Sequence, residues 1–151
     1  MNPTEFIMRL TPGAVASAKS SGIPASITVA QAALESAWGE SALSRLGNNL
    51  FGIKADGRWR GDTLSLQTRE FIDGKWMYVL AKWRKYTNWQ SSIEDHGSFL
   101  SKNPRYSECF KCQTSDSFAH ALSLSGYATD PNYPDKLIGL IRQHNLQSLD
   151  G

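Results

Sequence analysis

Glu35 is the residue whose surroundings most clearly suggest chemistry. It is the only charged residue between Lys19 and Glu40, and it lies in Ala30-Gln-Ala-Ala-Leu-Glu-Ser-Ala-Trp-Gly39, a stretch of mostly alanine and other apolar residues. Burial in such a setting disfavours the charged form of a carboxyl group and raises its pKa. A carboxyl that keeps its proton near neutral pH can act as a general acid. The alternative is a glutamate on a helix surface, the commoner situation for this residue type.

A second candidate carboxylate, Glu70, follows from the pattern of residues 63–72 and 75–86. Both segments are rich in β-formers, and Asp73-Gly74 between them is a strong two-residue turn signal. That turn fixes a register in which Glu70 pairs with Met77, on a mostly apolar face. Glu70 is therefore either a functional carboxylate near the free end of a hairpin or an edge-strand charge that deters aggregation.

The elements that must position these two residues are mostly helical. Thr11-Pro12 has the form of a cap and first helical turn, and Gly22 that of a helix stop. The spacing of apolar residues, with such stops, predicts helices over residues 12–21, 26–39, 89–102, 116–125 and 134–146, and a glycine-containing loop over 45–62. We therefore expect one α+β domain over residues 1–151, with a small β-lobe at about 60–87. A cleft between two lobes would bring Glu35 and Glu70 from opposite sides.

Composition excludes several classes of protein. The net charge of the 151 residues is only +2, which gives no reason to expect nucleic acid, although half of the sixteen basic residues lie between positions 54 and 85. Such a basic lobe suits an anionic polymer or is simply a solvated face. The first residues do not resemble a signal peptide, and no run of eighteen apolar residues predicts membrane insertion. We expect a monomer.

The cysteines, histidines and tryptophans offer weaker signals. Cys109 and Cys112 would need two more ligands to hold zinc, so we expect plain thiols or a local disulfide, with no metal and no cofactor. In the adjacent pair Asp95-His96, one residue is interpreted as a satisfied structural polar group. All five tryptophans lie between positions 38 and 89. Trp59, in the glycine-containing loop, is the best candidate for stacking on a sugar, and two others, Trp38 and Trp83, are better explained as core residues.

Five motifs occur together in a recognisable order. They are Ala30-Gln-Ala-Ala-Leu-Glu-Ser-Ala-Trp-Gly39, Asn49-Leu-Phe-Gly-Ile-Lys54, Thr68-Arg-Glu-Phe71, Asn103-Pro-Arg-Tyr106 and Gly126-Tyr-Ala-Thr-Asp-Pro131. With this order, the chain resembles glycoside hydrolase family 73 over about residues 20–147. The resemblance implies a lysozyme-like α+β fold. It also implies an endo-β-N-acetylglucosaminidase that cleaves the β-1,4 bond between N-acetylglucosamine and N-acetylmuramic acid in peptidoglycan glycan strands.

The resemblance also implies roles for individual residues. Glu35 would be the general acid, Glu70 the second carboxylate and Tyr127 an active-site tyrosine, while Asn49 and Phe51 would line the cleft. The mechanism stays open at this point. Glu70 could activate water or chiefly bind substrate, or the substrate's own acetamido oxygen could attack while Tyr127 helps to orient it.

Two other activities and several biological roles remain compatible with the sequence. The chain could be a lytic transglycosylase, which also depends on one glutamate, or a catalytically silent glycan-binding module. A wall hydrolase without a leader suggests a phage lysin or a toxin injected into a rival cell, delivered by another system to the periplasm or cell wall. The toxin role would imply a cognate immunity protein as partner.

Overall fold

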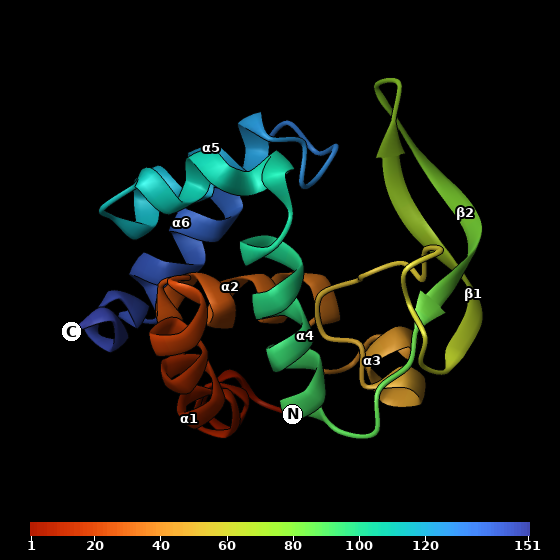
Figure 1. Cartoon of the computed structure of the whole chain (residues 1–151), viewed down its shortest axis with the longest axis horizontal. Helices are drawn as coiled ribbons and strands as arrows, with labels where there is room; N and C mark the ends of the chain where they lie inside the picture. The colour runs from red at the N-terminus through yellow and green to blue at the C-terminus, as the bar shows by residue number, and fades with distance from the viewer.

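Helices pack together into one lobe, and a two-stranded hairpin stands apart from them (Figure 1). The computed structural model describes all residues from 1 to 151. Its elements are α1 (Pro3–Ser21), α2 (Ala25–Ser36), α3 (Ala42–Gly47), β1 (Thr63–Ile72), β2 (Lys75–Arg84), α4 (Trp89–Ser101), α5 (Ser115–Leu124) and α6 (Tyr133–Gln143), with short 3₁₀ helices at Pro104–Lys111 and Leu146–Asp150. The predicted α+β, lysozyme-like class is confirmed.

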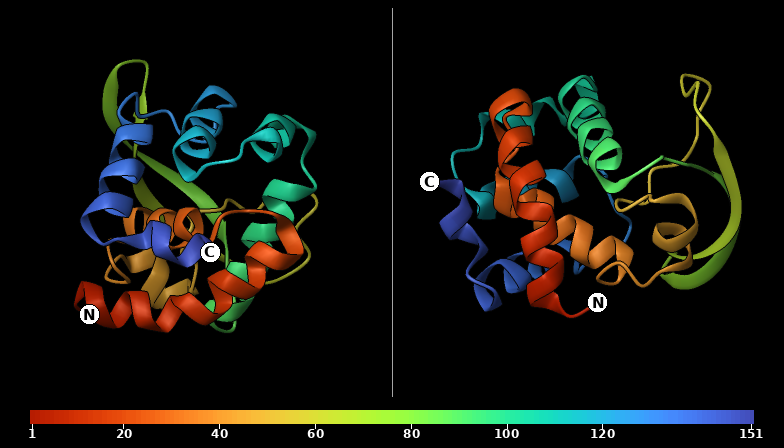
Figure 2. Two further views of the ribbon diagram at one scale, coloured as in Figure 1. Left: turned by 90° about the vertical axis from the view of Figure 1, so that its left-hand side faces the viewer. Right: turned by 90° about the horizontal axis from the view of Figure 1, so that it is seen from below.

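Helix α2 is the centre of the helical lobe. Every residue from Ala25 to Ala33 is buried, because α1, α5, α6 and the C-terminal 3₁₀ helix all pack against it (Figure 2). A helix covered on all sides must be apolar around its whole circumference. Small side chains let its neighbours approach closely, which accounts for the alanine-rich sequence.

Helix α1 begins earlier than the sequence predicted. Asn2 caps it by accepting a hydrogen bond from the backbone N–H of Glu5 at 2.9 Å, and Pro3 occupies the first turn. Pro12 therefore lies inside the helix, and the prediction of a helix start at Thr11-Pro12 is wrong. The same cap-and-proline pattern occurs at both Asn2-Pro3 and Thr11-Pro12, and packing of α1 against α2 and α4 continues the helix through the second of these.

Helix α2 ends at Ser36 rather than near Gly39. The next three residues, Ala37, Trp38 and Gly39, have positive φ values of 50°, 58° and 83°, and the Ser36 hydroxyl accepts a hydrogen bond from the Gly39 N–H at 2.9 Å. This left-handed turn stops the helix one residue after Glu35. It also directs Trp38 onto the Phe6 ring, with ring centroids 5.5 Å apart, so Trp38 packs against the core as predicted.

The hairpin has the predicted register, with Glu70 opposite Met77. Asp73 and Gly74 form its turn with φ values of 51° and 79°, the conformation that a two-residue turn requires. At the base Trp83 is buried, as predicted, whereas Tyr78 and Leu80 towards the tip are exposed. Helix α3 was not predicted, and only its last three residues fall in the predicted loop of residues 45–62. Ser41 caps this helix by accepting a hydrogen bond from the Ser44 N–H.

Candidate active site

A cleft of about 610 Å³ lies between the two lobes. Its walls come from the end of α2, the loop after α3, the outer half of the hairpin, and the segment that leads into α6. Its lining includes Glu35, Phe51, Gly52, Lys54, Arg69, Glu70, Trp76, Tyr127, Asp130, Tyr133 and Lys136. The predicted meeting of Glu35 and Glu70 in one cleft is therefore present.

Glu35 is a half-buried carboxyl whose pKa is raised to about 7, chiefly by burial. The charges of Glu70 and Asp130 raise the pKa further, while a hydrogen bond from Tyr133 and the charge of Lys136 lower it. Glu35 also occupies the last turn of α2, where the helix dipole disfavours an anion. That turn contains no basic side chain to offset the dipole. The carboxyl can thus carry a proton near neutral pH.

The loop after α3 covers one side of this carboxyl. Gly52 has φ +65°, and a Cβ atom there would lie 3.6 Å from Oε2 of Glu35. Asn49 holds the loop by donating hydrogen bonds to the carbonyls of Ile53 (2.9 Å) and Arg84 (2.8 Å) and by accepting one from the Ile53 N–H (3.1 Å). Asn49 is buried and is not among the cleft-lining residues, whereas Phe51 is among them.

Two tyrosines stand beside Glu35. Tyr127 lines the cleft, and its hydroxyl donates to the carbonyl of Phe51 at 3.3 Å. Its ring stacks on Tyr133, with centroids 5.7 Å apart. The Tyr133 hydroxyl, rather than that of Tyr127, is close enough to the Glu35 carboxyl to act on its pKa as a hydrogen-bond donor. Burial raises the pKa of both phenols well above the usual value, so both keep their protons.

Sequence reasoning missed Tyr133 because it placed the helix start at Pro134. The spacing of residues around Pro134 nevertheless indicated that Tyr133 belongs to the helix. Tyr133, Leu137 and Ile141 recur every fourth residue, and all three are buried on one side of α6. A helix extended by one residue would have directed Tyr133 towards the core beside α2.

Glu70 enters the cleft from β1, on the opposite lobe. Nζ of Lys54 lies 3.1 Å from Oε1 of Glu70, and the Glu70 side chain is 28% exposed. Lys54 was quoted in a sequence motif but was not predicted as a partner. The pair joins the hairpin to the loop that covers Glu35.

Comparison with known proteins agrees with this geometry. The family described as "Mannosyl-glycoprotein endo-beta-N-acetylglucosaminidase" matches residues 11–146. The chain belongs to this glucosaminidase family, glycoside hydrolase family 73. It is a glycoside hydrolase by family, as the sequence predicted.

Several relatives of this chain carry related names. The peptidoglycan hydrolase FlgJ of Vibrio parahaemolyticus is 40% identical over 91% of this chain and 46% of its own length. The exo-glucosaminidase LytG of Bacillus subtilis is 38% identical over 83% of this chain and 45% of its own. The chain thus spans about half the length of these curated relatives. The crystal structure of a peptidoglycan hydrolase mutant from Sphingomonas sp. A1 superimposes with a TM-score of 0.85, at 34% identity and 96% coverage of both chains.

Trp76, rather than Trp59, is the tryptophan in the cleft of this chain. The Trp76 side chain lines the cleft, with the Arg69 guanidinium 4.4 Å from its ring centroid and Lys136 Nζ 5.6 Å away across the opening. The structure places Trp59 elsewhere. Its ring contacts Tyr86 edge to face, and its Nε1 donates to the Asp62 carbonyl at 2.8 Å.

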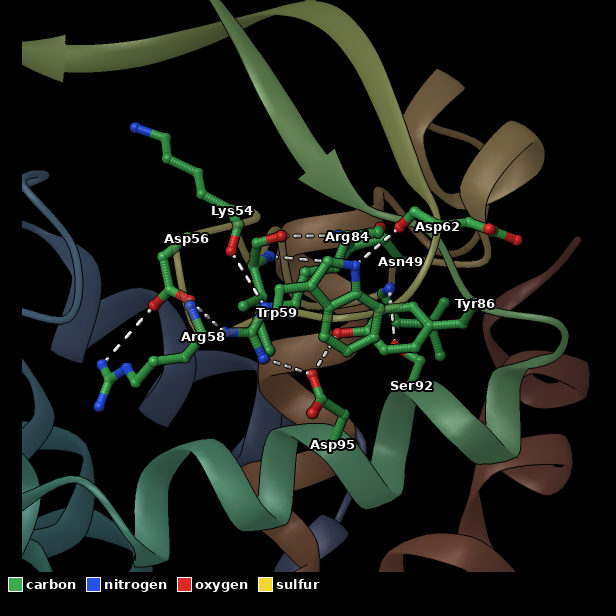
Figure 3. A network of polar contacts seen from close by, with 12 residues as sticks. Asn49, Lys54, Asp56, Arg58, Trp59, Asp62, Arg84, Tyr86, Ser92 and Asp95 are labelled. Carbon is green, nitrogen blue, oxygen red and sulfur yellow. Dashed lines mark hydrogen bonds and ion pairs between the residues drawn. The ribbon is translucent and has the colours of Figure 1, made fainter.

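A buried cation joins the two lobes at the base of the hairpin (Figure 3). Arg84, at the end of β2, is 6% exposed. It donates to Oδ2 of Asp95 on α4 at 2.9 Å and to the Lys54 carbonyl at 3.1 Å. The Tyr86 hydroxyl donates to the same Asp95 oxygen at 2.5 Å. Asp95 is thus the satisfied structural group of the Asp95-His96 pair, as one of the two was interpreted to be.

The remaining candidates do not form a site. Cys109 and Cys112 are free thiols. No group of three or more histidine, cysteine, aspartate or glutamate side chains is arranged to hold a metal ion. None of the helices combines the length and the apolar character needed to span a membrane.

Proposed function

We propose that this glucosaminidase cleaves the β-1,4 bond between N-acetylglucosamine and N-acetylmuramic acid in peptidoglycan, with Glu35 as general acid. The observation that carries the proposal is a carboxyl with a pKa of about 7 in a cleft that can receive a polymer strand. Glycosidic bond cleavage needs a proton on the leaving oxygen, and a carboxylic acid with a raised pKa supplies it. The names of the relatives, peptidoglycan hydrolase and exo-glucosaminidase, support the same substrate class.

Tyr133 assists the proton transfer in this mechanism. Its hydroxyl faces the Glu35 carboxyl and can donate to it, and a hydrogen bond to an ionised acceptor is stronger than one to a neutral acceptor. The contact therefore strengthens as Glu35 gives up its proton, which lowers the energy of the transition state relative to the bound substrate.

The positive charge that develops on the sugar ring needs a stabilising group on the side of the cleft opposite Glu35. Glu70 can act as the base that activates water once the hairpin closes. Alternatively the substrate's acetamido oxygen attacks, and Glu70 contributes only substrate binding. Substitution of Glu70 by Gln separates the two: a loss of rate as large as that of Glu35→Gln assigns the base to Glu70, and a mild defect assigns substrate assistance.

The test is digestion of purified sacculi, with mass spectrometry of the soluble products. Reducing N-acetylglucosamine ends are expected, and Glu35→Gln should lower the rate at least about a hundredfold while circular dichroism stays unchanged. Glu94→Gln, an exposed glutamate on α4, is the matched control and should retain wild-type activity. A near wild-type rate for Glu35→Gln would remove the acid assignment.

The same products decide between the competing activities. Ends of 1,6-anhydro-N-acetylmuramic acid would show a lytic transglycosylase, and sacculus binding without soluble product would show a glycan-binding module. The length of the fragments separates endo from exo cleavage. Early shortening of the long strands is expected here, whereas small products released from strand ends would indicate the exo mode named for the Bacillus relative.

A further inference from the structure

A buried histidine in this structure has no part in the mechanism described so far. His96, on α4, is fully buried and has no charged group beside it. Its Nε2 lies 2.9 Å from Oε1 of Gln31, while its Nδ1 has no hydrogen-bond partner. The imidazole ring stacks on Phe51 with centroids 3.8 Å apart. A polar ring in such a place needs an explanation, because buried polar atoms are nearly always paired.

Further polar contacts lead from His96 towards Glu35, the candidate acid. Gln31 is fully buried one helical turn before Glu35, and its Nε2 donates to the Tyr133 hydroxyl at 2.8 Å. The Tyr133 hydroxyl in turn faces the Glu35 carboxyl, whose pKa it lowers as a potential hydrogen-bond donor. Hydrogen bonds thus lead from His96 on α4 through Gln31 on α2 to Tyr133 on α6, whose hydroxyl stands beside Glu35.

We propose that His96 and Gln31 are positioning residues, which fix the direction of the Tyr133 hydroxyl proton so that it always points to Glu35. The proposal rests on the function proposed above for Glu35. Tyr133 has a single hydroxyl proton. Because Gln31 presents its NH₂ group to Tyr133, the hydroxyl accepts there and its proton is left for Glu35.

The tautomer of His96 fixes the orientation of the Gln31 amide. With its proton on Nε2, the ring donates to the Gln31 carbonyl oxygen and leaves only a bare acceptor, Nδ1, without a partner. With the proton on Nδ1, the ring would bury an unpaired donor, which is the rarer and costlier arrangement. The Gln31 amide would then turn around, and Tyr133 would donate to Gln31 instead of to Glu35. Burial also lowers the pKa of His96 to about 3, so the ring stays neutral.

The direction of the Tyr133 hydroxyl determines which Glu35 oxygen carries the acid proton. A carboxyl oxygen that accepts the Tyr133 proton is the less favourable place for the acid's own proton. The Glu35 proton is therefore kept on the other oxygen, available to a glycosidic oxygen in the cleft.

Two measurements on the folded protein test this series of polar contacts without relying on activity. Long-range ¹H–¹⁵N correlation spectra give the tautomer of each of the three histidines, and His96→Phe assigns the His96 signal. The neutral tautomer with its proton on Nε2 is expected throughout pH 5–9, and a proton on Nδ1 would overturn the proposal. A ¹³C titration of the Glu35 carboxyl then reports its pKa directly.

His96→Phe keeps the ring stack on Phe51 but removes the donor to Gln31. The Glu35 titration should move to higher pH, in the same direction as in Tyr133→Phe and by less, and kcat should fall about tenfold. In the Tyr133→Phe background, His96→Phe should cause no further shift, since the effect passes through the Tyr133 hydroxyl. An equal shift in both backgrounds would overturn the proposal.

Loss of stability alone must be separated from loss of positioning. Leu100→Ala, one turn further along α4, removes a fully buried side chain outside the chain of hydrogen bonds. It should lower Tm without moving the Glu35 titration. Gln31→Met replaces the amide by an apolar side chain of similar length, so it tests the same step if His96→Phe does not fold. Failure of the proposed function is distinguishable, because Glu35→Gln would then stay active whatever the titration shows.

Discussion

Glu35 shows how one residue can oppose stability and support function. Its pKa of about 7 in the folded chain lies above the ordinary value of 4.5. The folded state therefore favours the protonated carboxyl. That contribution to stability is fully present below pH 4.5 and is lost as the pH rises through about 7. The same protonated form is the one that donates a proton to substrate.

The pH dependence of activity should therefore follow Glu35. We expect kcat to fall above pH 7, about tenfold per pH unit, as the carboxyl ionises. Glu35→Gln removes the ionisation, and it should stabilise the folded chain at pH 8 by about 1–3 kcal/mol relative to wild type. At pH 4 the two proteins should have similar stability. Sacculus turnover across pH 5–9 and thermal unfolding at both pH values are the measurements, and a Tm difference that does not depend on pH would contradict the assignment.

At the scale of elements, the hairpin supplies a second wall and its own binding group. Trp76 presents an apolar ring in the cleft beside Arg69 and Lys136. Trp76→Ala should raise KM about fivefold with little change in kcat, because stacking on a sugar contributes about 1 kcal/mol and is uniform between ground and transition states. Steady-state kinetics on soluble glycan strands measure this.

The matched control for Trp76 lies on the same strand. Tyr78 is 73% exposed and does not line the cleft, so Tyr78→Ala should leave KM unchanged. Trp76→Phe should restore most of the affinity. A kcat defect in Trp76→Ala would instead indicate that the ring positions catalytic groups.

The base of the hairpin depends on one buried cation. Arg84→Met removes the guanidinium that pairs with Asp95 and leaves that carboxylate with the Tyr86 hydroxyl as its remaining donor. The variant should be destabilised by about 2–4 kcal/mol, since breaking a buried ion pair leaves the remaining charge uncompensated. Arg58→Met is the matched control, because both arginines form an ion pair with Asp56 but the Arg58 side chain is 80% exposed. Its loss should cost less than about 1 kcal/mol. Denaturant unfolding of both variants measures their losses of unfolding free energy, and equal losses would contradict a structural role for Arg84.

These elements also show what a sequence can and cannot predict. The Asp73-Gly74 turn and the alternating pattern were sufficient for the register of Glu70, because both are local. The start of α1 at Pro3 was missed because two local signals competed and long-range packing chose between them. Trp59 was chosen over the other tryptophans for its loop position, whereas Trp76 lines the cleft. Any tryptophan can stack on a sugar, and only the fold decides which one faces the cleft. Tyr133 was lost through an error of one residue in a helix boundary.

At the scale of the whole molecule, the two lobes differ in how they are stabilised. The helical lobe buries one contiguous core of 25 residues. The hairpin packs chiefly on itself and touches α3 at its base, while Trp76, Met77, Tyr78 and Leu80 remain exposed towards the tip. A two-stranded hairpin is only marginally stable alone. The wall that carries Glu70 and Trp76 should therefore open independently of the wall that carries Glu35.

Hydrogen exchange followed by mass spectrometry tests this difference. Amides of the outer half of β1 and β2 should exchange much faster than those of α2, and a bound chitin oligosaccharide should slow the hairpin selectively. Gly74→Ala places a side chain at φ +79°, where nothing lies within 4 Å. It should speed hairpin exchange severalfold through backbone strain of about 1 kcal/mol, with α2 unaffected. Gly57→Ala, also open but without positive φ, should change neither. Equal protection in both lobes would mean that they open as one unit, and closure of the hairpin could not then bring Glu70 to the substrate.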